Sequence, residues 1–171
     1  MTVMYRACIA IVDASRARLF TFERTAGAEG LHEQLSEQRD LVNLARRQPP
    51  SELFSDTRQG SSRTGGLHYK LDDHRDAHVD ALDAEFARTI VAALVDLIRS
   101  SSAQRLILCA SPRMLGTLRE VGGELHRGGL PIDELPRDLV KLTAAQLRDH
   151  LTSYGLLPPP PAAPPAFHRG A

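Results

Sequence analysis

Two short runs of apolar residues constrain the fold of this chain more than any other feature. Residues 7–12 read Ala-Cys-Ile-Ala-Ile-Val, and residues 106–110 read Leu-Ile-Leu-Cys-Ala. Apolar runs of this length, without polar alternation, are typical of strands that are buried on both faces of a sheet. The two runs therefore predict a covered sheet in which both form inner strands.

The N-terminal quarter of the chain predicts two strands and one ambiguous segment. The predicted order is a strand over residues 6–12, the turn Asp13-Ala14-Ser15, a strand over residues 16–23 and a turn over residues 27–30. In the segment that follows, Leu31 and Leu35 have helical spacing, whereas its position after two strands suits a third, more exposed strand. Periodicity alone leaves both structures open.

The second half predicts alternating helices and strands. A stripe of apolar residues at spacings of three and four predicts a helix of about five turns: Leu82, Phe86, Ile90, Leu94, Leu97 and Ile98. A strand over residues 105–110 follows. Ser111-Pro112 is a typical helix start, with serine as N-cap and proline at the first position. A short strand within residues 132–142 and a final helix after the capping box Thr143-Ala144-Ala145-Gln146 complete the order.

Composition limits the class of protein. The chain has 171 residues, of which 25% are charged and 42% hydrophobic, as expected for one globular domain with or without a tail. The first apolar run is too short to span a membrane and lacks a signal-peptide cleavage pattern, so we expect a cytoplasmic protein without membrane association. Cys8 and Cys109 each lie in an apolar run, and we expect buried free thiols rather than a disulfide.

Charge is unevenly distributed along the chain, although 21 basic residues balance 21 acidic ones. The segment 46–70 lacks regular periodicity, is interrupted by glycine and proline, and has more basic than acidic residues. Its basic residues are Arg46, Arg47, Arg58, Arg63 and Lys70, against Glu52 and Asp56. An acidic stretch over residues 72–85 follows. The neutral total thus conceals a basic loop, and long loops in compact domains are usually functional or disordered.

The C-terminus is rich in proline. Six of the eleven prolines lie within residues 158–165, so we expect a solvated polyproline-II extension from Leu157 onwards. An alternative is that this tail docks on a protein partner.

Three separated blocks of sequence resemble the bacterial host attachment protein family. The blocks are residues 11–20 (Ile-Val-Asp-Ala-Ser-Arg-Ala-Arg-Leu-Phe), residues 106–119 and residues 138–151. Members of this family are named as proteins required for attachment to host cells, and they are grouped with relatives of the archaeo-eukaryotic peptide-chain release factors. The resemblance covers residues 5–153.

The resemblance implies a single-domain α/β fold like the release factors' middle domain, which is RNase H-like. It implies a mixed sheet with three meandering strands, the third over residues 31–41, followed by alternating helices and strands. The domain is then expected over residues 1–153, with a long loop over 46–74, and a disordered proline-rich tail over 154–171.

In release factors, a Gly-Gly-Gln motif on the corresponding loop positions the water that cleaves the peptidyl-tRNA ester. Here the loop carries Gly65-Gly66-Leu67. Leucine has no donor or acceptor that could orient a nucleophilic water. Even if the two glycines correspond to the loop tip, we therefore expect no peptide release.

Metal chemistry has two candidate sites. His74 and His78, four residues apart near Asp73, would share one face of a helix and could bind a divalent cation. The alternative is that these histidines cap the apolar stripe. Asp13, after the first strand, is placed for two-metal phosphodiester cleavage, but residues 105–110 offer no second carboxylate. A turn role for Asp13 is favoured.

Ser111 and Arg113 form a candidate anion site. A helix N-terminus after a buried strand presents free amides, and an arginine would add charge beside them. The N-cap role alone also explains Ser111.

The resemblance implies a link to translation, and together with the observations above it predicts a non-catalytic, translation-associated protein. Its basic loop would contact ribosomal or transfer RNA, because phosphate contacts by arginine and lysine dominate such binding. Two alternatives remain: a metal-dependent hydrolase or nuclease, and a protein-interaction factor with an indirect role in attachment. A homodimer through an edge strand or the long helix is left open.

Overall fold

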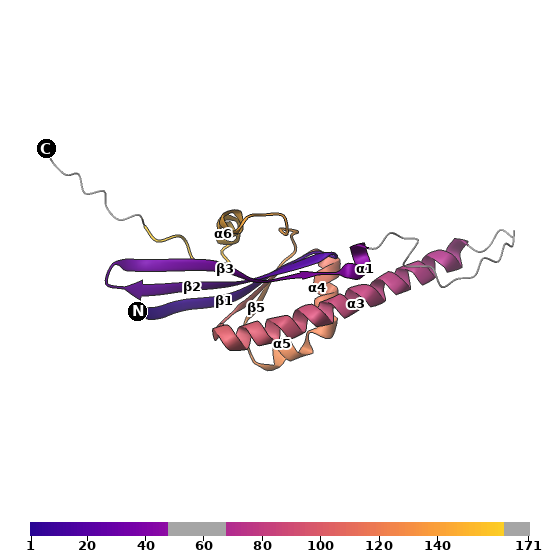
Figure 1. Ribbon diagram of the computed structural model, residues 1–171, viewed down its shortest axis with the longest axis horizontal. Helices are drawn as coiled ribbons and strands as arrows, with labels where there is room; N and C mark the ends of the chain where they lie inside the picture. The colour runs from indigo at the N-terminus through magenta and orange to yellow at the C-terminus, as the bar shows by residue number, and fades with distance from the viewer. Residues whose placement is uncertain (48–67, 163–171) are drawn as a thin grey trace.

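The central feature of the fold is one mixed sheet with helices on both sides. In the computed structural model the strand order is β3-β2-β1-β4-β5 (Figure 1). The structure describes the backbone of residues 1–47 and 68–162, and the side chains of residues 1–46 and 74–162. The strands are β1 (Thr2–Val12), β2 (Arg16–Gly27), β3 (Gly30–Val42), β4 (Leu106–Cys109) and β5 (Ile132–Leu135).

The helices follow the meander and separate the last strands. They are α1 (Leu44–Arg47), α3 (His68–Ser101), α4 (Pro112–Val121), α5 (Gly123–Arg127) and α6 (Ala144–Ser153). β1, β2 and β3 pair antiparallel, whereas β4 pairs parallel to β1 and β5 parallel to β4. This arrangement confirms the predicted single-domain α/β class, including the third strand. The RNase H-like assignment stays a prediction.

Local chemistry fixes both turns of the meander. The Asp13 carboxylate accepts the backbone N–H groups of Ser15 and Arg16, each at 2.7 Å, so Asp13 has the favoured turn role. The turn between β2 and β3 ends at Gly30, whose φ of +112° is a backbone conformation that residues with a Cβ rarely adopt.

The two faces of the sheet are covered differently. On the first, which we call the α3 face, Ala10, Leu19 and Leu108 pack against Ile90 and Leu94 of α3, and α4 and α5 extend the cover. α3 and α5 lie below the sheet in Figure 1, and α6 lies above it.

On the second face, which we call the α6 face, Ile9, Phe20 and Phe22 pack against residues of α6 and the chain around it. These covering residues are Leu139, Val140, Leu147, Leu151 and Leu157. Cys8 belongs to the α3 face and Cys109 to the α6 face, and both are buried free thiols as predicted.

Two segments differ from the expected boundaries. α3 begins at His68, so Lys70 and the residues up to 74 are helical rather than part of the loop. No glycine or proline occurs between residues 68 and 101, so nothing in the sequence ends the helix once it has begun. In Figure 1 its first turns run past the end of the sheet.

The second difference is at the C-terminus, where the expected solvated tail does not begin at Leu157. That side chain is only 3% exposed and packs in the core of the α6 face. The rest of the tail, from residue 163, lies outside the described residues.

Candidate functional site

The described residues of the predicted sites gather at one end of the molecule. β1 and β4 end there, α4 begins there, and α1 contacts the part of α3 that runs past the sheet (Figure 1). Arg46, His74, His78, Ser111 and Arg113 lie here. The side chains of Arg47, Arg58, Arg63, Lys70 and Asp73, and the tip Gly65-Gly66-Leu67, lie outside the described residues.

Arg46 connects α1 to α3. Its guanidinium donates to both carboxylate oxygens of Asp83, with Nη2 at 2.9 Å from Oδ2 and Nε at 3.1 Å from Oδ1. The Asp83 side chain is only 6% exposed, so this pair holds a buried carboxylate. Arg46 therefore has a structural partner, which limits its availability for a ligand.

The start of α4 has the predicted cap. Ser111 Oγ accepts the backbone N–H of Met114 at 3.3 Å, and Pro112 is the first helical residue. Arg113 forms an ion pair with Asp80 of α3, and both side chains are 63% exposed. An anion at this helix start would compete with Asp80 for Arg113, and anion binding stays a prediction.

The two histidines lie one turn apart on α3, and both are exposed. Nowhere among the side chains that the structure describes do three or more histidine, cysteine, aspartate or glutamate residues come together as a metal site would require. Three of the described carboxylates at this end are engaged: Asp13 in its turn, Asp80 with Arg113 and Asp83 with Arg46. The geometry is that of a surface held together by ion pairs.

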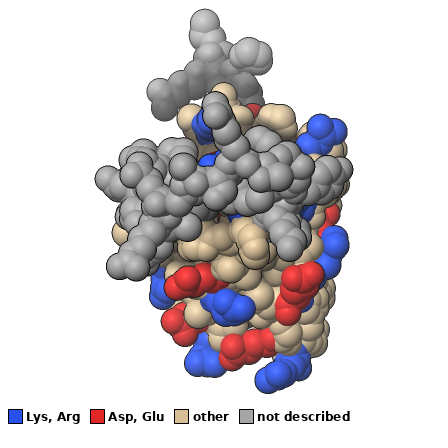
Figure 2. All heavy atoms as spheres, turned by 90° about the vertical axis from the view of Figure 1, so that its right-hand side faces the viewer, with Lys and Arg blue, Asp and Glu red and all other residues tan. Residues whose placement is uncertain are grey.

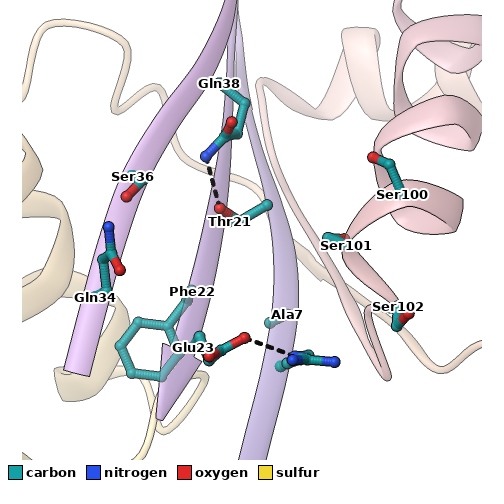
Figure 3. A pocket seen from close by; sticks show the side chains of 11 residues that line it. Ala7, Thr21, Phe22, Glu23, Gln34, Ser36, Gln38, Ser100, Ser101 and Ser102 are labelled. Atoms are coloured by element: carbon teal, nitrogen blue, oxygen red, sulfur yellow. Dashed lines mark hydrogen bonds and ion pairs between the residues drawn. The ribbon is translucent and has the colours of Figure 1, made fainter. Parts of the chain in front are cut away.

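A polar hollow of about 350 Å³ lies at the opposite end of α3, between the last turn of the helix and the sheet. Figure 3 shows the lining side chains of β2 and β3 across from the end of α3. Its polar lining residues are Arg6, Thr21, Glu23, Gln34, Ser36, Gln38, Ser100, Ser101 and Ser102.

The chemistry of the hollow is nearly neutral. Gln38 donates to Thr21 Oγ1 at 2.9 Å, and Arg6 Nε donates to Glu23 at 2.6 Å. With one ion pair and otherwise uncharged donors and acceptors, its chemistry suits an uncharged polar group better than an ion. Gln34, Ser36 and Gln38 occupy alternate positions of β3 and so lie on one face of the strand. The sequence alone did not reveal this alternation, because Leu31 and Leu35 in the same segment also fit a helix.

A comparison with known families can now be added to this geometry. The model of the family described as "Protein required for attachment to host cells" matches residues 8–151. The chain belongs to this family. The host attachment match runs from β1 into α6, so it includes the sheet and the end at which the predicted sites gather.

The match confirms the resemblance to the host attachment family inferred from the three sequence blocks. The description of the matching family does not mention release factors. Among curated proteins, no sequence matches. Within residues 1–47 and 68–162, no helix is long and apolar enough to cross a membrane.

Proposed function

We propose that this member of the host attachment family is a non-catalytic binding protein that contacts ribosomal or transfer RNA through the segment 46–70. The observation that carries the proposal is the charge of this segment: five basic residues against two acidic ones in a chain with no net charge. Phosphate contacts by arginine and lysine supply most of the affinity of such complexes.

The charges of the rest of the molecule support this assignment. Nine described arginines form ion pairs with carboxylates of the same chain: Arg6, Arg16, Arg18, Arg24, Arg46, Arg105, Arg113, Arg119 and Arg148. Figure 2 shows the end from which the segment departs, and basic and acidic side chains alternate on its visible described surface. A balanced surface of this kind produces no strong field of its own, so the segment would supply the excess positive charge.

The non-catalytic part rests on the engaged carboxylates and on Leu67. Asp13, Asp80 and Asp83 each have partners within the chain, and Leu67 offers no group that would position water. The choice of ribosomal or transfer RNA rests on the resemblance to relatives of the release factors.

Sedimentation with purified ribosomes tests the proposal. We expect the wild-type protein to co-sediment at about 50 mM salt and to be released at about 200 mM, because counterions compete for the phosphates. The variant Arg58→Glu/Arg63→Glu should remain in the supernatant at both salt concentrations. The matched control is Arg99→Glu/Arg127→Glu, which changes the net charge equally at exposed positions on α3 and α5. Absence of wild-type protein from the low-salt pellet would overturn the proposal.

A further inference from the structure

The start of the C-terminal tail packs on the α6 face against a set of side chains that we call the cleft: Tyr5, Arg24, Glu33 and Arg148. We call residues 156–159 the strap. The strap is fixed to the end of α6, since the backbone N–H groups of Leu156 and Leu157 both donate to the Leu151 carbonyl, at 2.9 and 3.3 Å. Tyr5 of β1 donates its hydroxyl to the Leu156 carbonyl at 3.2 Å. The buried Leu157 side chain anchors the strap in the core.

Two arginines hold the prolines of the strap by their backbone. Arg148 Nη2 donates to the Pro158 carbonyl at 2.8 Å, and Arg24 Nη2 donates to the Pro159 carbonyl. Glu33 of β3 orients both guanidiniums, with 2.8 Å between its Oε2 and Arg148 Nη2 and 2.7 Å between its Oε1 and Arg24 Nε. The three charged side chains are only 12–15% exposed, so the donors are well fixed.

This arrangement has the chemistry of polyproline recognition. Proline has no backbone N–H, so a protein that binds a proline-rich strand by its backbone donates to its carbonyls. Here the donors are Tyr5, Arg24 and Arg148. Phe22 supports two of these donors: Tyr5 packs edge-on against it with ring centroids 5.8 Å apart, and the Arg148 guanidinium lies over it at 5.3 Å.

Few contacts of the cleft depend on the side chains of the strap. The polar contacts go to backbone carbonyls, and Leu157 is the one strap side chain buried in the core. A hollow of about 330 Å³ also lies along the strap, lined by Tyr5, Arg105 and Thr152 on the side of the body. A longer or different peptide would therefore find the same donors and additional space.

We propose that this cleft, formed by Tyr5, Arg24, Glu33 and Arg148, binds an extended Leu-Pro-Pro peptide of a partner protein, and that the strap occupies it in the free protein. A segment attached so closely to α6 has an effective concentration in the millimolar range, so the strap keeps the cleft closed to weak ligands. A partner peptide binds when it displaces the strap.

The test uses the full chain and a fluorescently labelled peptide of the sequence of residues 154–162, with anisotropy as the readout. Leu157→Asp places a charge in the apolar core and releases the strap. We expect this variant to bind the peptide at least about tenfold more tightly than the wild type, whose cleft is occupied. Equal binding by the two proteins would overturn the proposal.

A second pair of variants tests the donors. Arg24→Ala, added to Leu157→Asp, should abolish binding. Arg16→Ala is the matched control, because Arg16 is also a β2 arginine paired with a β3 carboxylate, Asp40, and lies at the other end of β2 from Arg24. Equal losses for the two arginines would contradict the proposal.

Two further measurements keep the test decisive. If Leu157→Asp shows no cooperative thermal transition, Pro158→Gly/Pro159→Gly replaces it, because that change loosens the strap and leaves Leu157 in place. Light scattering of the wild type without peptide should give a monomer. A dimer formed by exchange of tails would show that the occupant is a second copy, and would overturn the assignment to a partner peptide.

Discussion

The two faces of the sheet are closed by different means. On the α3 face the cover is regular helix, and the helix satisfies its own backbone carbonyls while its apolar stripe fills the core. On the α6 face the ten-residue helix α6 shares the cover with an irregular segment around Val140 and with the strap. Irregular backbone that packs on a core leaves carbonyls in need of donors.

Arginines supply those donors on the α6 face. Arg18 Nη1 donates to the carbonyls of Val140 and Leu142, at 3.0 and 2.6 Å, while its Nη2 lies 2.7 Å from Glu37 of β3. Arg24 and Arg148 hold the strap in the same way, with Glu33 as their common carboxylate. The difference teaches that a covering segment without regular structure depends on fixed side-chain donors, whereas a covering helix does not.

The largest effect is expected at Glu33. Glu33→Ala leaves two largely buried guanidiniums without a counter-charge, which should lower the free energy of unfolding by about 3 kcal/mol, measured by urea denaturation. Asp40→Ala is the matched control, because Asp40 is a β3 carboxylate whose pair with Arg16 is 42–43% exposed. We expect about 0.5 kcal/mol or less for the control. Similar losses in both variants would show that burial of the Glu33 cluster adds nothing.

Leu157 gives the next largest effect. Leu157→Ala leaves a cavity in the core of the α6 face and should cost about 2.5 kcal/mol in urea denaturation. Pro160→Ala, at an exposed position just after the strap, is the control and should change stability by less than about 0.5 kcal/mol. A Leu157→Ala protein as stable as the wild type would mean that the strap is not part of the core.

Arg18 tests the donors to irregular backbone more directly. Arg18→Lys keeps the charge but loses the planar fork, so the Val140 and Leu142 carbonyls lose their shared donor. We expect a loss of about 1.5 kcal/mol. Hydrogen exchange should then rise in residues 139–142 and stay unchanged in α3. Hydrogen exchange that becomes faster to the same extent on both faces would contradict a local role for Arg18.

The two buried thiols, one on each face, allow the faces to be compared by the pH dependence of stability. Burial raises the pKa of Cys109, on the α6 face, to about 12. Burial also raises the pKa of Cys8, on the α3 face, where a hydrogen bond with Ser101 opposes the shift. Because the folded Cys109 thiol keeps its proton while the unfolded one ionises, its contribution to the free energy of unfolding is complete below about pH 9 and declines as the pH rises toward 12.

We therefore expect each thiol to contribute to a fall in stability above pH 9, with Cys109 responsible for about 1 kcal/mol by pH 10. Urea denaturation at pH 8 and pH 10 measures the fall. Cys109→Ala should reduce it more than Cys8→Ala does. The reverse order would mean that the α3 face excludes water better than the α6 face.

Local sequence patterns predicted the α3 face well. The spacing of Phe86, Ile90 and Leu94 predicted the helix, and the apolar runs predicted β1 and β4, because burial on a regular element repeats with its period. The β3 strand required the family resemblance, since Leu31 and Leu35 also fit a helix.

The strap and the ion pairs were not predictable in this way. The strap is buried by residues from β1, β2 and α6 that are far from it in sequence, and its prolines indicate solvent exposure when read alone. At the candidate site, the Ser111 cap was predicted because it is local. The partners of Arg46 and Arg113, Asp83 and Asp80, come from another helix, and their spacing along the chain carries no signal.

Arginines that hold the cover of the α6 face are committed to carboxylates and carbonyls, so they contribute little to binding an external polyanion. We propose that RNA is bound by the basic residues of the segment 46–70 and not by the arginines of the body.

The salt dependence of transfer RNA binding, measured by fluorescence anisotropy, tests this claim most directly. Arg46 pairs with Asp83, which leaves four basic residues in the segment, so a plot of log affinity against log salt should have a slope of about −3. Arg58→Ala/Arg63→Ala should reduce the magnitude of the slope by about 1.5, and Arg99→Ala/Arg127→Ala should leave it unchanged. Binding that is absent or independent of salt, or a slope lowered only by the Arg99 and Arg127 changes, would contradict the claim.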